Sequence, residues 1–366
     1  MIDYPFSTIL INNREVDLEE IISGKENAQS DFEKSTFAFI KKWFTGADLF
    51  YQKTSGSTGT PKEIPISRDQ MRSSAMLTET ALQLKEGFTA LVCLDTQYIA
   101  GKMMLVRSFV TGMKIIAVNP SANPLLNLPH YQKMDFAAFV PYQIQEMLSK
   151  DSAIKLNKIQ TAIIGGTVLD NGTRNILQEF DCQFYATYGM TETVSHIALQ
   201  KLNGENASDF FQVLPNIEIK LDNRNCLIIN SPFLNDSIYT NDVVDIKSLT
   251  SFKLIGRYDN VINSGGVKIS PEKVEIQIGD ILNEVGLGQS FFVAGVPDSR
   301  LGQKIVLIIE SDKYAIEVLE KINSMFKQRL SSYEIPKEIV FLKTFLFTTT
   351  GKVNRIKTIE LVKNQS

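Results

Sequence analysis

The sequence is poor in the residues that build metal and disulfide sites. It has three cysteines, Cys93, Cys182 and Cys226, without Cys-x-x-Cys spacing, and two histidines, His130 and His196. A structural zinc ion usually needs four Cys or His ligands at short spacing, so we expect no such site. An odd, dispersed set of cysteines is typical of a reducing compartment. We therefore expect a cytoplasmic protein.

The sequence also lacks a strong charge and an uninterrupted apolar run of membrane-spanning length. The net charge of -3 and the pI near 5.7 create no field that would attract a nucleic-acid backbone. The longest apolar stretch, residues 99–118, contains Lys102, Arg107 and Lys114, which a bilayer would penalise. Residues 1–5 lack the basic and apolar parts of a signal peptide. We expect no nucleic-acid partner and no membrane insertion.

What remains is an ordinary globular composition in a long chain. Hydrophobic residues make up 43% and charged residues 22% of the 366 positions. These fractions exclude disorder, collagen and coiled coil as descriptions of the whole chain. The length corresponds to about two or three domains with a sizeable buried core.

From residue 89 the hydrophobic pattern predicts an α/β domain. Short apolar runs at 89–94, 114–118, 136–140 and 160–164 are typical of buried strands. They alternate with helical stretches such as 141–149, which begins with a proline suited to a first helical turn. Strands that alternate with helices favour a parallel sheet covered by helices.

The pattern changes twice further along the chain. Residues 217–221 and 226–229 predict a hairpin, and hence a β-rich insertion. After residue 260 the pattern is that of a smaller α+β unit, with helices at 271–282 and 315–330 and strands at 291–296, 304–310 and 338–342. We place a boundary near 257–260, which gives a large domain of residues 1–258 and a small domain of residues 259–366.

One loop has the composition of a polyphosphate-binding site. Thr54-Ser-Gly-Ser-Thr-Gly-Thr-Pro-Lys62 offers backbone N–H and hydroxyl donors, with Lys62 as the counter-charge. It differs from the Walker loop, which has Gly-Lys-Ser/Thr, because Pro61 precedes the lysine. This difference argues against a P-loop NTPase. Taken alone, such a run is more often a flexible loop.

Three further motifs suit a nucleotide. Tyr188-Gly-Met-Thr-Glu192 offers an aromatic face, a hydroxyl and a carboxylate for a hard cation. Asp242 and Arg257 offer groups that bind ribose hydroxyls, and Lys352 follows a glycine in a hydroxyl-rich loop. Individually these segments are also compatible with a turn after a strand, with surface charges and with a solvated tail lysine.

In this order, the four motifs resemble the adenylate-forming (AMP-binding) superfamily of acyl-CoA synthetases and peptide-synthetase adenylation domains. The resemblance covers about residues 50–357. Within the superfamily, residues 188–193, the run 264–271 and the short chain look most like the o-succinylbenzoate–CoA ligases of menaquinone biosynthesis. The resemblance implies a large α/β domain and a small mobile α+β domain.

The resemblance also implies a nucleotide site. A Gly-Gly turn would lie beside the adenine and Tyr188 would stack on it, within a motif that includes Gly189 and Met190. Thr191 would contact the α-phosphate and Glu192 would bind Mg2+. The implied ligands of the β- and γ-phosphates are Thr54, Ser55, Gly56, Ser57, Thr58, Gly59 and Lys62, and the Gly-Gly turn is Gly165 and Gly166.

The remaining implied roles concern the small domain and the ribose. Asp242 and Arg257 would bind the ribose, and Asp259 stands at the hinge position. Lys352 would bridge the carboxylate and the α-phosphate during adenylation. The pantetheine tunnel would be lined by Gly265 and Gly266.

Two features depart from the superfamily pattern. About fifty residues precede the phosphate loop, where relatives usually have many more, so part of the first subdomain is expected to be missing. Gln97-Tyr98 replaces the aromatic–His pair that commonly gates the acyl pocket. We expect this pocket between residues 97–107, 165–168 and 187–196.

A substrate with a second carboxylate needs a cationic or multi-donor partner in that pocket. The candidates for contact with the acid are Tyr98, Lys102, Arg107 and His196. The plain alternative places Lys102 and Arg107 on the polar face of an amphipathic helix. For His196 it is a structural hydrogen bond.

The sequence therefore predicts a ligase that uses ATP, Mg2+ and coenzyme A to activate a small carboxylic acid through acyl-AMP. The acid could instead be another aryl or medium-chain acid, and a carrier thiol could replace CoA. A non-catalytic nucleotide-binding or carrier-docking module is the alternative from another class, although both Glu192 and Lys352 are present. The oligomeric state, a homodimer included, is left open.

Overall fold

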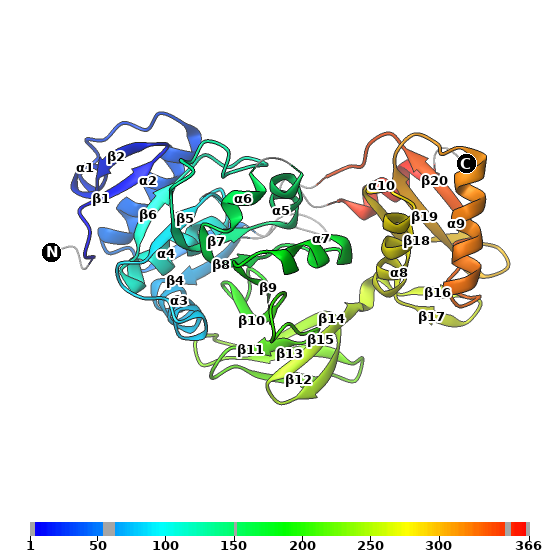
Figure 1. Ribbon diagram of the computed structural model, residues 1–366. Coiled ribbons are helices and arrows are strands. Elements are labelled where there is room, and N and C mark those ends of the chain that lie inside the picture. Colours follow the sequence, from blue (N-terminus) through cyan, green and yellow to red (C-terminus); the bar gives the residue numbers. More distant parts are fainter. Residues whose placement is uncertain (1–3, 54–62, 150–151, 348–352, 364–366) are drawn as a thin grey trace.

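The computed structural model describes residues 4–53, 63–149, 152–347 and 353–363 (Figure 1). The predicted phosphate loop, Thr54 to Lys62, and the predicted catalytic Lys352 lie outside the described residues. Figure 1 shows a large body, coloured blue to light green, and a smaller body, coloured yellow to red.

In the described part of the chain, 13 strands form one continuous sheet in the large body, in the order β12-β13-β14-β15-β11-β10-β9-β8-β7-β5-β6-β1-β2. The pairs from β9 through β8, β7 and β5 to β6 are parallel, and β1 joins β6 in parallel. The remaining pairs are antiparallel. The strands are β1 (Thr8–Ile11), β2 (Arg14–Asp17), β5 (Thr89–Val92), β6 (Lys114–Ala117), β7 (Met134–Phe139), β8 (Ile159–Ile164), β9 (Gln183–Gly189), β10 (His196–Lys201), β11 (Phe211–Val213), β12 (Glu218–Leu221), β13 (Cys226–Asn230), β14 (Ile238–Ser248) and β15 (Ser251–Arg257).

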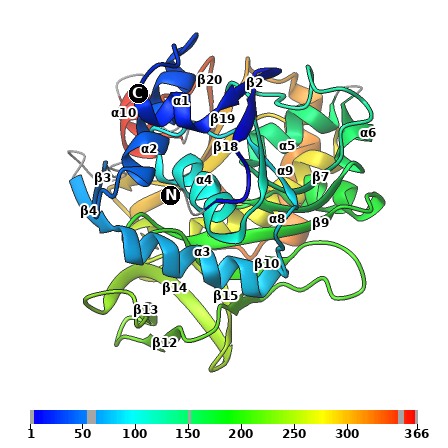
Figure 2. The same ribbon diagram turned by 90° about the vertical axis from the view of Figure 1, so that its left-hand side faces the viewer.

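Two hydrophobic clusters cover the two faces of the parallel strands. Along β5, Ala90 and Val92 belong to one cluster, and Leu91 belongs to the other. This alternation follows from the two-residue period of a strand, and a parallel sheet buried on both faces explains the continuous apolar runs. In the first cluster α3 packs against α4 (Figure 2). The helices of the large body are α1 (Leu18–Ser23), α2 (Asp31–Phe44), α3 (Arg68–Leu82), α4 (Ile99–Thr111), α5 (Pro141–Leu148), α6 (Ala153–Leu156), α7 (Asn171–Ile176) and the 3-10 helix η1 (Leu177–Glu179).

The strands of a separate hairpin precede and follow the predicted phosphate loop in the sequence. Strands β3 (Leu49–Lys53) and β4 (Glu63–Ser67) pair antiparallel, and Lys53 is opposite Glu63. The described residues that flank positions 54–62 therefore lie opposite each other. Helix α3 follows β4 directly, and Ser67 and Gln70 form a capping box at its start.

The small body contains a second sheet with its own hydrophobic clusters. In the described residues β18 pairs antiparallel with β19, which pairs in parallel with β20 and antiparallel with β16. Its elements are the 3-10 helix η2 (Tyr258–Asn260), β16 (Ile262–Ser264), β17 (Val267–Ile269), α8 (Pro271–Glu284), β18 (Phe291–Asp298), β19 (Gly302–Glu310), α9 (Ile316–Arg329), β20 (Glu338–Leu342) and α10 (Arg355–Lys363).

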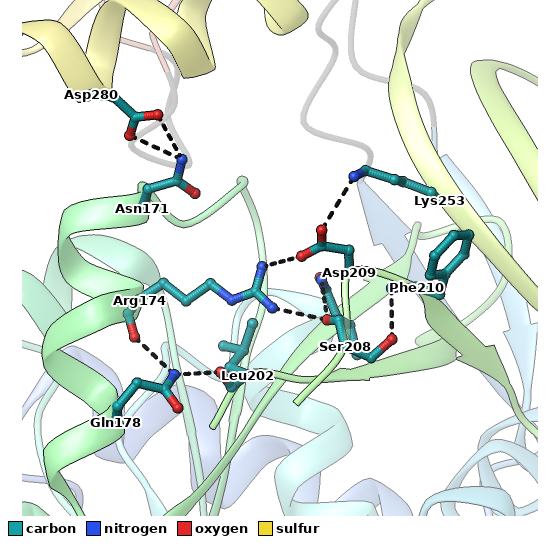
Figure 3. A network of polar contacts seen from close by, with 10 residues as sticks. Asn171, Arg174, Gln178, Leu202, Ser208, Asp209, Phe210, Lys253 and Asp280 are labelled. Carbon is teal, nitrogen blue, oxygen red and sulfur yellow. Dashed lines mark hydrogen bonds and ion pairs between the residues drawn. The ribbon is translucent and has the colours of Figure 1, made fainter. Parts of the chain in front are cut away.

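One place where the two bodies meet is between α7 and α8 (Figure 3). The Asn171 side-chain amide donates to the Asp280 carboxylate at 3.0 and 3.3 Å. Behind this contact, Asp209 accepts from Arg174 at 2.8 Å and from Lys253 at 3.3 Å, which ties α7 to the antiparallel part of the sheet. The contact between the bodies is therefore a small polar one at this point.

The predicted fold class is confirmed: a parallel-rich α/β sheet, a β-rich insertion and a small α+β unit are all present. The boundary at residues 258 and 259 falls within η2, between the last strand of the large sheet and the first strand of the small one. That boundary stays a prediction. No helix in the described ranges is long and apolar enough to cross a membrane.

Candidate active site

The candidate nucleotide site lies at the carboxyl ends of two neighbouring parallel strands. Strand β8 ends at Ile164, immediately before Gly165 and Gly166, and β9 ends at Gly189 within the Tyr188–Glu192 motif. Ligands of open α/β sheets bind at such strand ends. A Cβ atom on Gly165 would lie 2.6 Å from the Thr187 hydroxyl oxygen, so a larger residue here would force the Thr187 side chain or the strand ends to shift.

The turn after β9 is held by one side chain and includes an unfavourable backbone conformation. The Thr193 hydroxyl accepts from the Met190 N–H at 2.9 Å and contacts the carbonyl oxygens of Met190 and Ser195. Val194 has φ +67°, a left-handed conformation that is costly for a β-branched residue. Thr191 is half-buried and Glu192 is exposed. The turn therefore presents both predicted phosphate-side residues from a fixed frame.

A second group joins the motif to the predicted ribose residues. The Tyr188 hydroxyl donates to Asp242 Oδ2 at 2.6 Å, and Arg257 Nη1 donates to Asp242 Oδ1 at 3.3 Å. Arg257 also makes two hydrogen bonds to Asp259, of 2.9 and 2.7 Å. The fold thus brings together four residues that the sequence placed in the nucleotide site or at the hinge.

The protonation of this group follows from burial and pairing. Burial, and then the Asp242 charge, raise the pKa of Tyr188, so the phenol stays neutral and can donate. Burial raises the pKa of Asp259, but the hydrogen bonds and charge of Arg257 outweigh it, so the pKa is lowered overall. The Tyr188 ring is 7% exposed and meets Phe211 and Phe252 edge-on. Adenine stacking on this ring stays a prediction.

A buried cluster lies behind the same turn. Arg107 on α4 is 2% exposed and donates through Nε to the Thr78 hydroxyl at 3.2 Å. Its Nη2 donates to Ser195 Oγ at 2.5 Å and lies 3.4 Å from His196 Nδ1, while Thr78 also contacts His196 Nε2 at 3.1 Å. In the described ranges no carboxylate lies within ion-pair distance of this guanidinium. Arg107 is a buried cation held by neutral groups.

Burial changes the titration of both bases in this cluster. It lowers the pKa of Arg107 to about 9, and the guanidinium still carries its charge near neutral pH. Burial, followed by the charge of Arg107, lowers the pKa of His196 well below its usual 6.5. His196 is therefore a neutral imidazole. The idea that Arg107 lies on an exposed polar helix face is wrong, because α4 packs between the sheet, α2 and α3.

The neutral His196 predicts a pH-dependent stability. Below pH 6.5 the unfolded chain takes up a proton at this position and the folded chain does not, so the free energy of unfolding falls as the pH falls. For one group the slope approaches about 1.4 kcal/mol per pH unit. Urea unfolding between about pH 6.5 and 5 should show this slope weakened by His196→Gln and kept by His130→Gln at an exposed position. An unchanged slope in His196→Gln contradicts the assignment.

Two other predicted acyl-site residues lie at the start of α4. Lys102 is half-buried and donates to Gln52 Oε1 at 2.8 Å, on the strand that leads into the phosphate loop. Burial lowers the pKa of Lys102. Tyr98 immediately precedes the helix and is 37% exposed. Lys102 thus links the predicted acyl region to the strand before the phosphate loop.

Gly265 and Gly266 lie apart from these groups. They form the two-residue turn between β16 and β17, where φ values of +59° and +84° suit a hairpin turn that favours glycine. Figure 1 shows this hairpin at the end of the small body away from β9. A role of this turn at the same site would therefore require the small body to move.

Sequence reasoning missed the residues that hold the site from distant positions. Thr78 and Ser195 are 29 and 88 positions from Arg107. Thr193 belongs to the run 188–193, but the sequence assigned no role to its side chain. The signal that could have suggested them is an arginine inside a run of apolar residues, which needs several polar partners once buried.

The site lies at the carboxyl ends of strands β8 and β9 and includes the Glu192 carboxylate. These features suit a nucleotide bound with Mg2+. Mg2+ is usually held by one or two carboxylates together with substrate phosphates, which matches Glu192 as a single exposed carboxylate. Among the described residues no cluster of three or more His, Cys, Asp or Glu side chains could hold a metal ion by itself.

The comparisons with known proteins give the family. Residues 8–227 match the model of the family described as AMP-binding enzyme, so the chain belongs to that family. The resemblance seen in the motifs is thereby confirmed, and the chain is an enzyme of this family.

Three relatives illustrate the match. The chain is 23% identical over 362 residues to 2-succinylbenzoate--CoA ligase of Listeria monocytogenes, covering 92% of this chain and 74% of the relative. It is 38% identical to a solved acyl-CoA synthetase (AMP-forming)/AMP-acid ligase II-like protein of Dyadobacter fermentans, with a TM-score of 0.62 and coverage of 93% and 97%. The o-succinylbenzoate CoA synthetase of Bacillus subtilis, solved with the intermediate OSB-AMP, has a TM-score of 0.77 at 16% identity, with coverage of 96% and 95%, and supports the fold.

Proposed function

We propose that this enzyme is an ATP-dependent carboxylate–CoA ligase that acts through acyl-AMP and takes o-succinylbenzoate as its acid. Membership of the AMP-binding family supports the reaction class. The names of the Listeria monocytogenes and Staphylococcus aureus relatives support the acid. In this proposal the products are the CoA thioester, AMP and pyrophosphate, which places the enzyme in menaquinone biosynthesis in the cytoplasm.

The observation that carries the choice of acid is the buried cation of Arg107. A charge removed from water is costly unless it is paired. Among the described residues Arg107 has only neutral partners, and it shares Ser195 and His196 with the turn that presents the nucleotide motif. A dicarboxylate fits this environment, because one carboxylate reacts with ATP and the second supplies the missing negative charge.

The nucleotide end of the site supports the first half-reaction. The ribose would lie against Asp242 and Arg257. Asp242 Oδ1 and Arg257 Nη1 are 3.3 Å apart. Thr191 would contact the α-phosphate from the turn after β9, and Glu192 would hold Mg2+. When bound, Mg2+ neutralises phosphate charge. Gly165 and Gly166 would form the wall beside the adenine.

The chemistry proposed has two steps. A carboxylate oxygen of the acid attacks the α-phosphorus of ATP and displaces pyrophosphate, and the CoA thiolate then attacks the acyl carbon and displaces AMP. The first step brings negative groups together, so its main requirement is positive charge fixed in place. The phosphate loop and Lys352 would supply it. In the second step the small domain would turn, so that the Gly265-Gly266 hairpin approaches the site as the lining of the thiol path.

The acid is tested by a substrate panel. With ATP and CoA, o-succinylbenzoate should form AMP at least about 30-fold faster than benzoate, coumarate or octanoate, as expected for a charge pair worth about 2 kcal/mol. The measurement is kcat/KM for AMP release with each acid. Equal rates with a monocarboxylate would point to a ligase for another aryl or medium-chain acid. Absence of turnover with every acid and thiol would favour a non-catalytic module.

A pair of variants connects this selectivity to the cluster. Arg107→Gln should reduce the preference for o-succinylbenzoate over benzoate by about tenfold or more, because it removes the buried charge. Lys102→Gln removes a cation whose partner is Gln52, and it should leave the preference within about threefold. The ratio of the two acids is the measurement, since a loss of stability lowers both rates together. An unchanged ratio in Arg107→Gln contradicts the assigned role.

A further inference from the structure

An ion pair in the small body lies next to the stretch that contains Lys352. Arg355, the first residue of α10, donates through Nη2 to Glu275 Oε2 on α8 at 2.8 Å. The other oxygen of Glu275 accepts from the Val293 N–H on β18 at 2.8 Å. The guanidinium also lies 5.4 Å from the centre of the Phe292 ring. One arginine therefore joins the start of α10 to both α8 and β18.

The described residues on either side of positions 348–352 are held together. Phe347 and Val353 form an antiparallel bridge, and the Asn354 N–H donates to the Leu346 carbonyl at 2.7 Å. The buried Thr358 hydroxyl accepts from the Leu346 N–H at 3.3 Å. The described residues that flank positions 348–352 are thus held at one place, and Val353 is two residues before Arg355.

The pair is placed where it can set the position of residues 353–355, which form the base of the stretch that contains Lys352. The Glu275 side chain is 16% exposed and the Arg355 side chain 33% exposed, so water screens the interaction only in part. A displacement of about 1 Å in a reacting group can cost about 100-fold in rate. Because the bridge and the Arg355 anchor are adjacent in the chain, loss of the anchor would move the base of the Lys352 stretch.

We infer that Arg355 and Glu275 form a positioning pair that fixes the base of the Lys352 stretch on α8 and β18, and that adenylation depends on this pair while thioester formation does not. The inference rests on the proposed function, in which Lys352 acts in the first half-reaction. Neither Arg355 nor Glu275 contacts the reacting atoms in this role. The pair acts through Lys352.

The small body offers a matched control. Arg329 on α9 pairs with Glu284 at the end of α8 at 2.7 Å, with side chains 45% and 54% exposed. This pair also bridges two elements of the same body, but it has no contact with the residues that flank positions 348–352. A general effect of deleting an arginine ion pair would appear at both sites.

The experiment measures the two half-reactions separately in the full-length enzyme. Arg355→Met should lower o-succinylbenzoate-dependent ATP–pyrophosphate exchange by about 10- to 100-fold, and leave thioester formation from preformed acyl-AMP within about threefold. Glu275→Gln, which keeps an acceptor for the Val293 N–H, should show the same split more weakly. Arg355→Lys should restore most of the exchange, and Arg329→Met should alter neither step. Thermal unfolding of each variant shows whether it is folded.

Combination with Lys352→Ala separates positioning from general damage. If Arg355 acts through Lys352, the double variant exchanges pyrophosphate no more slowly than Lys352→Ala alone. Additive losses, equal losses in both half-reactions, or normal exchange in Arg355→Met overturn the inference. If the unmodified enzyme shows no o-succinylbenzoate-dependent exchange, the proposed function fails; if Lys352→Ala itself exchanges normally, the role of Lys352 fails and the inference fails with it. If only Arg355→Met is normal, the proposed function stands and the positioning pair is wrong.

Discussion

Replacing Lys352 with alanine should lower carboxylate-dependent ATP–pyrophosphate exchange by roughly 100-fold or more, the effect of removing one fixed electrostatic donor. The reacting carboxylate and the α-phosphate both carry negative charge, and a lysine between them offsets their repulsion. Lys352 is the lysine of the C-terminal loop whose sequence resembles the superfamily motif. Thioester formation from preformed acyl-AMP should be far less affected, because that step starts after the phosphorus has reacted.

The control for this prediction is Lys357→Ala. Lys357 lies five residues further along, is exposed on α10, and carries the same charge. Its replacement tests whether exchange responds to the net charge of the segment or to one positioned ammonium group. We expect exchange within about twofold of the unmodified enzyme. Near-normal exchange in Lys352→Ala would remove the assignment of Lys352 to adenylation.

The parts of the fold that the sequence predicted well are those in which burial determines the pattern. Strands β5, β6, β7 and β8 are buried on both faces, so their residues form short continuous apolar runs that can be recognised without knowledge of their neighbours. In the small body α8, β18, β19, α9 and β20 were predicted, whereas the short strands β16 and β17 and the helix α10 were not. The N-terminal hairpin β1–β2 was not predicted. It is short and half-polar, and its place beside β6 depends on pairing across about 100 residues.

The candidate site divides in a similar way. Residues adjacent in the chain, such as Tyr188 to Glu192, form a motif whose chemistry can be read directly. The partners of Arg107 could not be predicted, because Thr78 and Ser195 come from different elements and become neighbours only through packing. The polar-face explanation of Arg107 was wrong because helix periodicity says which residues share a face, and not whether another helix covers that face.

The predicted hinge and the predicted ribose site share one side chain in this structure. Arg257 is bonded to Asp242 on β14 and to Asp259 in η2, the 3-10 helix that leads into the small body. A ribose bound at Asp242 and Arg257 would compete for the same donors. Nucleotide binding and hinge rotation would then be coupled, because a change at either one alters the bonds that Arg257 can make.

Asp259→Pro should slow thioester formation and largely preserve adenylation, whereas Lys352→Ala should do the reverse. Proline fixes φ near -65° and removes the backbone N–H, and it also restricts Tyr258 before it, so the chain at η2 should keep one conformation. If the small domain must turn here between the two steps, adenylation should stay within roughly tenfold and thioester formation should slow by about two orders of magnitude or more. The measurements are pyrophosphate exchange and CoA-thioester formation from preformed acyl-AMP.

Asp259→Ala is the matched variant, because it removes the carboxylate that binds Arg257 and leaves φ free. A loss of thioester formation in Asp259→Pro that is absent in Asp259→Ala comes from the fixed backbone, and a loss shared by both comes from the missing ion pair. A circular-dichroism melt identifies a misfolded variant, in which both half-reactions fall together. If both fall together in a normally folded Asp259→Pro enzyme, rotation at residue 259 is not what separates the two steps, and the small domain does not exchange Lys352 for the thiol path by turning at this residue.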